Sequence, residues 1–215
     1  MTAVRADLTV SLDGFVAAPN ASLEHPLGEG CERLHEWAFE TASFRRQHGL
    51  EGGEANTDSD VVQESLDATG AVIMGRRMFS GGEGPWSADP NADGWWGDDP
   101  PFHVPVFVLT HHARETLDKQ GGTSFVFVTE GIDAALARAR AAAGDKDVLV
   151  AGGAAVVQQA IAAGALDELQ LHVAPLLLGG GVPLFGDFAG GPITGLEATR
   201  VIESPSVTHL RYRFS

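Results

Sequence analysis

Two glycines between a short apolar run and a helical segment are the clearest candidate in the sequence for anion chemistry. Residues 148–151 are four apolar side chains, too short a run for a helix and typical of a strand buried on both faces. Gly152 and Gly153 follow at once, and residues 154–163 then show helical spacing. Free N–H groups at a helix N-terminus attract anions, and glycine lets a phosphate approach the main chain. We expect a dinucleotide pyrophosphate here; glycines needed only for close packing are the alternative, because the full G-x-G-x-x-G pattern is absent.

Two arginines follow a second apolar run, residues 71–74. Gly75, Arg76, Arg77 and Met78 come directly after this run, although the whole chain has only 14 Lys and Arg. An arginine guanidinium matches two phosphate oxygens with parallel hydrogen bonds. We therefore expect phosphate binding at this strand end. The alternative is that Arg76 and Arg77 form ordinary ion pairs with nearby carboxylates.

A hydroxyl and two imidazoles follow a third apolar run, residues 106–109. Thr110, His111 and His112 are suited to a ribose 2′-phosphate. The carboxyl ends of parallel strands lie on one edge of a sheet, where α/β proteins bind ligands. We therefore expect the three strand ends to form one dinucleotide site.

Asp13 stands at the end of the first predicted strand and is the best-placed ionisable candidate. A carboxyl group there could relay a proton or bind substrate. The alternative is a turn residue, because Asp13-Gly14 is a strong turn dipeptide.

The long irregular stretch at residues 81–105 contains three tryptophans. Trp86, Trp95 and Trp96 could form a lid or one wall of an aromatic pocket, or could be core or dimer contacts. Residues 89–94 match the first half of a calcium loop, D-x-N-x-D-G, but Pro100 stands where the bidentate glutamate belongs. We expect a solvated acidic loop there. The eight histidines show no zinc spacing, so we expect no transition-metal site.

The elements that position these residues alternate between strands and helices. We expect strands at residues 4–12, 71–74, 106–109, 125–128, 148–151 and 166–174, helices at 31–48, 61–68, 132–143 and 154–163, loops at 49–60 and 81–105, and a closing hairpin of 201–204 with 207–214. The sequence shows no repeat and no linker, so we expect one α/β domain over residues 1–215. Its sheet should be mostly parallel, with an antiparallel C-terminal edge.

Composition narrows the classes of partner. The 215 residues are 44% hydrophobic and 20% charged, as in soluble globular proteins. A net charge of −15 argues against nucleic-acid and anionic-membrane partners. Cys31 is the single cysteine, which excludes an internal disulfide and fits a reducing compartment. The sequence shows neither a secretory signal nor a membrane-length apolar run, so we expect a cytoplasmic protein.

The chain resembles the dihydrofolate reductase-like superfamily, in particular the C-terminal reductase domain of bacterial bifunctional riboflavin deaminase-reductases. The matching segments run in the family's order and span nearly the whole chain. They are SLDGFVA (11–17), VIMGRRMF (72–79), VFVLT (106–110), VLVAGGAAVVQQAI (148–161) and LDELQLHVAPLLLGGGVPLF (166–185). The resemblance implies a three-layer dihydrofolate reductase-like fold and an NADPH-dependent reductase, and PLLLGGG favours the riboflavin-type branch. It also implies a homodimer.

The resemblance assigns residues to a cofactor site and a substrate site. In the family, the residues that match Gly75 to Met78 hold the cofactor phosphates, and those that match Thr110 and His111 lie at the adenosine 2′-phosphate. The residues that match Gly152 to Val156 wrap the pyrophosphate. The cofactor residues so expected are Ala17, Gly75, Arg76, Arg77, Met78, Thr110, His111, Ala151, Gly152, Gly153, Ala154, Ala155 and Val156. The substrate residues expected from the resemblance and from the patterns above are Ser11, Asp13, Glu36, Trp86, Leu178 and Gly179.

One departure from the riboflavin branch leaves the substrate open. That branch carries glutamate immediately before the Gly pair, where this chain has Ala151. The first expectation is a reductase of a small heterocyclic substrate that resembles the 5-amino-6-(5-phosphoribosylamino)uracil reductase of riboflavin biosynthesis. A dihydrofolate reductase is the second. In that case Glu32, Glu36 or Glu40 on the first predicted helix would engage the pterin ring, and Glu36 is the most central of the three. An inactive nucleotide- or flavin-binding protein is the third.

Overall fold

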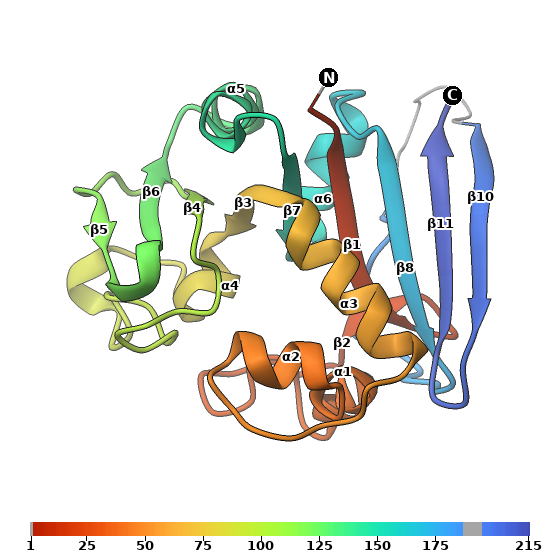
Figure 1. Ribbon diagram of the computed structural model, residues 1–215. Helices are drawn as coiled ribbons and strands as arrows, with labels where there is room; N and C mark the ends of the chain where they lie inside the picture. The colour runs from red at the N-terminus through yellow and green to blue at the C-terminus, as the bar shows by residue number, and fades with distance from the viewer. Residues whose placement is uncertain (1, 187–194) are drawn as a thin grey trace.

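A large mixed sheet runs through the molecule (Figure 1). The computed structural model describes residues 2–186 and 195–215. The strands of this sheet are β1 (Val4–Ser11), β3 (Thr69–Gly75), β4 (Pro105–Leu109), β5 (Leu117–Asp118), β6 (Ser124–Val128), β7 (Asp147–Gly152), β8 (Glu168–Ala174), β10 (Leu196–Glu203) and β11 (Thr208–Phe214). Their order is β10-β11-β8-β1-β7-β3-β4-β6-β5 over the described residues.

The pairing confirms the predicted mixture of parallel and antiparallel strands. The block from β8 through β1, β7, β3 and β4 to β6 is parallel. The C-terminal hairpin of β10 and β11 adds to β8 antiparallel. The short strand β5 pairs antiparallel with β6 at the opposite edge and was not predicted, because two residues leave no periodicity to detect. Strand β10 begins five residues earlier than the predicted 201–204.

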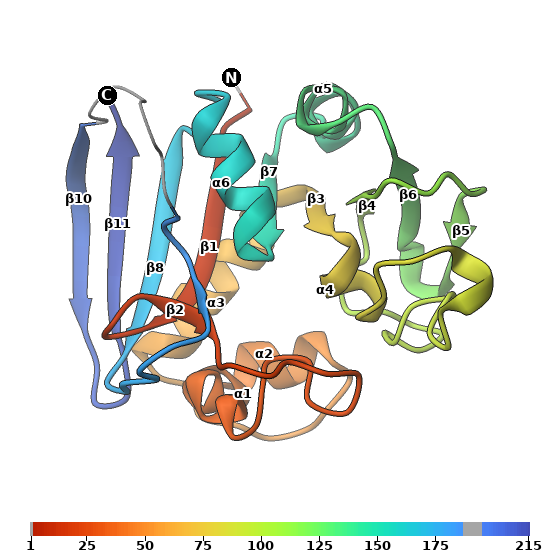
Figure 2. The same cartoon turned by 180° about the vertical axis from the view of Figure 1, so that it is seen from behind.

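Successive side chains of β1 point to opposite faces of the sheet, and the two faces differ in what they contact. Val4, Ala6, Leu8 and Val10 share a core with the helices α5 (Ile132–Ala143) and α6 (Ala154–Ala162). Arg5 and its neighbours on the other face meet α3 (Thr57–Ala68). Ser65 of α3 and Thr69, the first residue of β3, accept hydrogen bonds from the Arg5 guanidinium. Helix α3 crosses β1 in Figure 1, and α6 covers the sheet in the reverse view of Figure 2. The result is a three-layer α/β arrangement.

A second core cluster lies over β3, β4 and β6. Its members are Val72, Met74, Phe79, Val106, Val108, Phe125 and Phe127. Helix α4 (Arg76–Ser80) and the stretch 81–105, with the 3-10 turn η2 (Trp86–Ala88), cover this cluster. The stretch predicted as a loop therefore contributes apolar side chains to the core.

The predicted helix over residues 31–48 is wrong. The segment consists of η1 (Cys31–Leu34), α1 (Glu36–Phe39) and α2 (Ala42–Gln47). Thr41 takes an extended conformation, with φ −77° and ψ 144°, and its hydroxyl accepts a hydrogen bond from the Phe44 N–H. Threonine is a strong N-cap, so a new helix starts after it although the apolar spacing continues.

Helix α3 starts earlier than the predicted 61–68. The side chain of Asn56 accepts a hydrogen bond of 2.9 Å from the N–H of Ser59, which caps the helix one turn before the first apolar position. The predicted loop consequently ends at residue 56. None of the helices described at 2–186 and 195–215 is long and apolar enough to cross a membrane.

Candidate functional site

The three strand ends that the sequence singled out lie side by side. Gly75 at the end of β3 pairs with Leu109 of β4, and Met74 pairs with Gly152 of β7. A Cβ built on Gly75 would stand 3.0 Å from a methyl carbon of Val156 and 3.8 Å from the Gly153 nitrogen. The parallel sheet thus brings the Gly-Arg and Gly-Gly segments into contact, as the sequence predicted.

The Gly-Gly turn has room on its outer side. Gly152 has φ 124°, a conformation that favours glycine, and the Gly152–Gly153 peptide is cis. Gly153 has an ordinary φ of −69°, and a Cβ built on it would meet no atom within 4 Å among the described residues. Packing therefore does not explain the second glycine. Helix α6 begins at Ala154, and within the described part of the chain no side chain caps it, which leaves N–H groups for an anion.

Arg76 and Arg77 both pair with carboxylates, the alternative that the sequence left open. Arg76 is buried, forms an ion pair with Asp89 and lies 3.5 Å from the centre of the Trp86 ring. Arg77 is exposed and pairs with Glu83. The side chain of Arg76 is therefore committed to the interior, and it cannot reach a phosphate without breaking a buried pair.

Asp89 is held as an anion by its partners. Burial raises its pKa, but hydrogen bonds from the Ser80 hydroxyl and the Asn91 N–H, together with Arg76, outweigh burial and lower the pKa below its usual range. These contacts use the carboxylate that a calcium loop would need. Over residues 2–186 and 195–215 no cluster of three His, Cys, Asp or Glu side chains could hold a metal ion.

Trp86 and Trp96 pack against the core cluster over β3, β4 and β6, which is the core alternative that the sequence left open. Trp86 packs edge-on against Phe127, with ring centroids 4.9 Å apart, and Trp96 packs against Phe102 at 4.8 Å. Trp95 donates to the Met78 carbonyl at 2.9 Å. These contacts order the stretch 81–105 over α4.

Trp86 lies beside the end of β4, at the Thr110–His112 corner. Its indole N–H donates to the His112 carbonyl at 2.8 Å. Thr110 is buried, and its hydroxyl accepts from the His112 N–H at 3.1 Å, whereas His111 is exposed. Trp86 was expected at the substrate, but its contacts place it next to the residues expected at the 2′-phosphate.

Arg114 is a site residue that sequence reasoning missed. Its guanidinium lies 4.7 Å from the Trp86 ring, on which it stacks as Arg76 does, and it pairs with Asp93 at 3.1 Å. An open hollow of about 650 Å³ is lined by Trp86, Ala92, Ala113, Arg114 and Glu115. The signal for Arg114 in the sequence was a positive charge four residues after Thr110.

Asp13 closes a turn between two distant segments. Its carboxylate accepts from the Ser11 hydroxyl at 2.6 Å, from the Leu178 N–H at 3.1 Å and from the Gly179 N–H at 2.7 Å. The short strands β2 (Phe15–Ala17) and β9 (Val182–Pro183) pair next to this turn. Four residues predicted at the substrate site, Ser11, Asp13, Leu178 and Gly179, are thus brought together.

The ionisation of Asp13 bears on its expected role. The Ser11 hydroxyl, first, and the Gly179 N–H, second, lower the pKa of the Asp13 carboxyl below its usual range. A carboxylate that is ionised at neutral pH has no proton to give. The geometry therefore favours the turn role, which the sequence left open, over a proton source.

Glu36 is exposed at the start of α1, whereas Trp37 and Ala38 are buried. The preceding turn η1 packs its Leu34 in a small apolar cluster with Leu178. The segment at 31–39 therefore forms a wall next to the Asp13 turn, and this wall presents apolar side chains to it.

Comparison with known proteins now identifies the family. The family model of the RibD C-terminal domain matches residues 2–204. The chain belongs to the RibD C-terminal domain family. Among curated proteins the chain has no significant match.

Solved structures of this family and of dihydrofolate reductase share the fold. A protein from Shewanella sp. PV-4, provisionally assigned to riboflavin biosynthesis, has a TM-score of 0.64 at 20% identity, with 100% of this chain and 99% of that chain covered. A diaminohydroxyphosphoribosylaminopyrimidine deaminase/5-amino-6-(5-phosphoribosylamino)uracil reductase from Thermotoga maritima has a TM-score of 0.56 at 15% identity, with 100% and 57% covered. Dihydrofolate reductase from Enterococcus faecalis, solved with NADP(H), has a TM-score of 0.50 at 12% identity, with 99% and 96% covered.

These likenesses establish the fold. The protein has a dihydrofolate reductase-like α/β fold with a mostly parallel central sheet and antiparallel edge strands, which confirms the prediction from the resemblance. The chain spans 57% of the length of the Thermotoga maritima protein.

Proposed function

We propose that the protein is an NADPH-dependent reductase of a small heterocyclic substrate. The observation that carries the proposal is the turn at Gly152–Gly153, where the second glycine faces open space at the start of α6. Membership of the RibD C-terminal domain family supports the same reading. One related structure is that of a 5-amino-6-(5-phosphoribosylamino)uracil reductase, which is the type of reaction proposed here.

The residues around the turn fit a pyrophosphate. The first N–H groups of α6, at Ala154 and Ala155, and the bare main chain of Gly153 would bind the oxygens. Val156 packs against Gly75, so the two glycine segments approach as closely as their atoms allow. Met78 stands on the other side, since a Cβ built on Gly152 would lie 3.8 Å from its sulfur.

The end of β4 fits the 2′-phosphate that distinguishes NADPH from NADH. The exposed imidazole of His111 and the main chain after Thr110 lie one strand away from Gly75. Arg76 is left out of this contact because it is paired with Asp89 inside the protein. Arg77 is exposed and would exchange Glu83 for a phosphate at low cost, since exposed ion pairs contribute about 0–1 kcal/mol.

The Asp13 turn fits the nicotinamide and substrate end of the site. NADPH, when bound, supplies the hydride, and the protein supplies position. The ionised Asp13 locks the Ser11 turn to the N–H groups of Leu178 and Gly179, which fixes the edge of the site next to Ala17. The apolar wall of η1 would exclude water from this side.

The position of Ala151 bears on the substrate. Its side chain packs against the apolar cluster around Met74, so this strand end offers a methyl group where the riboflavin branch has a carboxylate. A substrate panel must therefore contain dihydrofolate as well as the ribosylaminopyrimidine. Oxidation of NADPH with one of them decides between the two reductase types, and cofactor binding without turnover on any member favours the inactive binder.

A titration of the whole protein with NADPH and NADH tests the cofactor. We expect tighter binding of NADPH, and we expect Gly153→Asp to abolish binding by placing a carboxylate against the pyrophosphate. The φ of Gly153 is one that any residue adopts and the space beside it is open, so we expect the substituted protein to fold. Ala137→Asp on the exposed face of α5 is the matched control, since it adds the same charge elsewhere. Equal affinity for the two cofactors, or normal binding by Gly153→Asp, would refute the assignment.

A further inference from the structure

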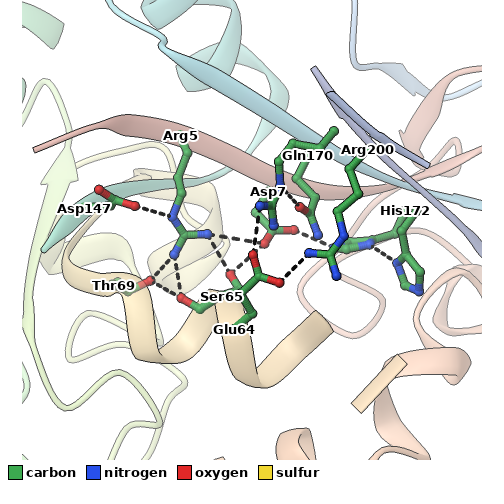
Figure 3. Close-up of polar contacts among 11 residues, drawn as sticks. Arg5, Asp7, Glu64, Ser65, Thr69, Asp147, Gln170, His172 and Arg200 are labelled. Atoms are coloured by element: carbon green, nitrogen blue, oxygen red, sulfur yellow. Dashed lines mark hydrogen bonds and ion pairs between the residues drawn. The ribbon is translucent and has the colours of Figure 1, made fainter. Parts of the chain in front are cut away.

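A buried chain of four ionisable side chains crosses the sheet on the α3 side, away from the glycine turns. It runs from Asp7 on β1 through His172 on β8 and His209 on β11 to Asp58 on α3. The distances are 2.6 Å from Asp7 to His172 Nε2, 2.6 Å between the two Nδ1 atoms, and 2.8 Å from His209 Nε2 to Asp58. His172, His209 and Asp58 are each at most 5% exposed. Figure 3 shows the Asp7 end of this chain, with His172, Arg5 and Ser65 labelled.

Hydrogen-bond counting fixes the number of protons in the chain. The carboxylates of Asp7 and Asp58 accept hydrogen bonds, so each facing Nε2 atom carries a proton. Two Nδ1 lone pairs 2.6 Å apart would repel each other, so a third proton lies between them. Two neutral imidazoles bring only two N–H protons. The pair therefore holds one proton more than two neutral histidines.

We propose that His172 and His209 share this extra proton at neutral pH, with His172 as the imidazolium that donates to Asp7 and to His209. His209 is then neutral, donates from Nε2 to Asp58 and accepts at Nδ1. The shared cation joins β1, β8, β11 and α3 through one chain of hydrogen bonds. The inference stands independently of the proposed reductase activity.

The surroundings of each histidine agree with this distribution. Burial raises the pKa of Asp7, but His172, Arg5 and Ser65 outweigh burial and hold the pKa well below its usual range. Burial lowers the pKa of His209, against the opposing attraction of Asp58. Asp7 thus faces a cation on one side, while His209 is the partner that burial keeps neutral.

Further charged groups flank this chain, among them Glu64 on α3, which pairs with Arg211 on β11 at 2.8 Å. Arg5 lies 3.7 Å from Asp7 and 3.5 Å from Asp147, so β1 and β7 contribute one further cation and one further anion. From the η1–α1 junction, His35 faces the pair. Burial, first, and the positive charge of His172, second, lower the pKa of His35 to about 4, so it remains neutral.

The aromatic ring of Trp37 covers the pair from α1. Its centroid lies 4.6 Å from that of His172 and 5.3 Å from that of His209, and its N–H donates to Thr9 at 3.2 Å. An indole face is the preferred aromatic neighbour of a cation. The wall of η1 and α1 therefore rests on the histidine pair through Trp37.

Asp7→Asn is the sharpest test, because it keeps the shape and removes the charge. An asparagine amide can donate to His172 Nε2 while His172 donates from Nδ1 to His209, so a neutral chain becomes satisfied without the extra proton. His25→Gln, at a half-exposed histidine on a loop, is the control.

Imidazole ¹⁵N NMR of the whole protein at pH 7.5 reads the protons directly. We expect two protonated nitrogens on His172 in the wild type and in His25→Gln, a protonated Nε2 and an accepting Nδ1 on His209, and a neutral His172 in Asp7→Asn. The pKa of His35 should rise in Asp7→Asn because the neighbouring charge is gone. Two neutral histidines in the wild type, or an unprotonated His209 Nε2 that places the proton on Asp58, would overturn the proposal.

Unfolding by urea between pH 7 and 8.5 gives a second readout. Wherever the folded pair keeps a proton that the unfolded histidines have lost, the folded-to-unfolded ratio should fall as the pH rises, by at most about tenfold per pH unit. The stability of Asp7→Asn should depend less steeply on pH. Burial raises the pKa of the Cys31 thiol in both proteins, so its contribution cancels in the comparison. Equal slopes would contradict the shared proton. Should Asp7→Asn not fold, the wild-type spectrum decides alone.

Discussion

Two adjacent arginines show how far residue type predicts role. Arg76 and Arg77 follow the same strand and carry the same charge, yet Arg76 is 8% exposed and Arg77 is 73% exposed at the side chain. A sequence gives both the same phosphate-binding potential. The difference arises from Asp89, which comes from an irregular stretch whose path no periodicity predicts, and which turns Arg76 inward under Trp86.

Breaking each pair should have very different consequences for stability. Asp89→Asn leaves the buried Arg76 without its counter-charge, and we expect the free energy of unfolding to fall by about 3–5 kcal/mol. Glu83→Gln, which breaks the exposed pair of Arg77, should change it by less than about 1 kcal/mol. Urea unfolding of the two variants makes the comparison. Similar losses would show that Arg76 does not depend on Asp89 in the folded protein.

The candidate site was predictable where strand ends define it. The apolar runs before Gly75, Thr110 and Gly152 located parallel strands, and parallel strands bring their ends to one edge. The partner of Asp13 was not predictable, because Gly179 lies more than 160 residues away and meets it only after β2 and β9 pair. Arg114 was missed because its role follows from stacking on Trp86, a contact without a sequence pattern.

At the scale of elements, the central strands and α5 were predicted closely, whereas α3, β10 and the segment 31–48 were not. Helix α5 has the predicted bounds, and β4, β6 and β7 each extend one residue or less beyond the predicted runs at either end. The segment 31–48 shows the limit of periodicity. Apolar spacing continued through Thr41, whose hydroxyl instead starts a new helix. Capping residues thus decided the boundaries that apolar spacing left open.

The cap of α3 can be tested in the same terms. Asn56→Ala removes the acceptor for the Ser59 N–H, and we expect a loss of about 0.5–2 kcal/mol in the free energy of unfolding. Asn56→Asp keeps an acceptor and places a negative charge at the helix N-terminus, so it should retain the stability. Chemical denaturation of both variants measures the effect. A loss in Asn56→Asp as large as in Asn56→Ala would show that α3 starts independently of this cap.

At the scale of the whole molecule, the two faces of the sheet have different chemistry. The α5 and α6 face is an apolar core, whereas the α3 face carries an ionic network. Glu64 of α3 pairs with both Arg200 and Arg211, which extends this network to the C-terminal hairpin. The sequence predicted a strand at residues 4–12 but not the burial of polar side chains on one of its faces. That burial depends on α3 and on the segment 31–48, which pack over this face.

This burial makes the stability of the fold sensitive to acid through His35. The unfolded histidine binds a proton near pH 6.5, whereas burial and the nearby His172 lower the folded pKa to about 4. Between these values the unfolded state binds more protons, so stability should fall as the pH drops from 6.5 to 4 and level off below for this group. The expected contribution is about 3 kcal/mol.

His35→Gln isolates this contribution because glutamine does not titrate. We expect the difference in unfolding free energy between the wild type and His35→Gln to change across pH 6.5–4. Urea unfolding at half-unit pH steps measures both. Parallel curves for His35→Gln would mean that His35 titrates normally in the folded protein, and that the α1 wall leaves it open to water. The acid range thus reports on His35, and the range above pH 7 reports on the proton shared by His172 and His209.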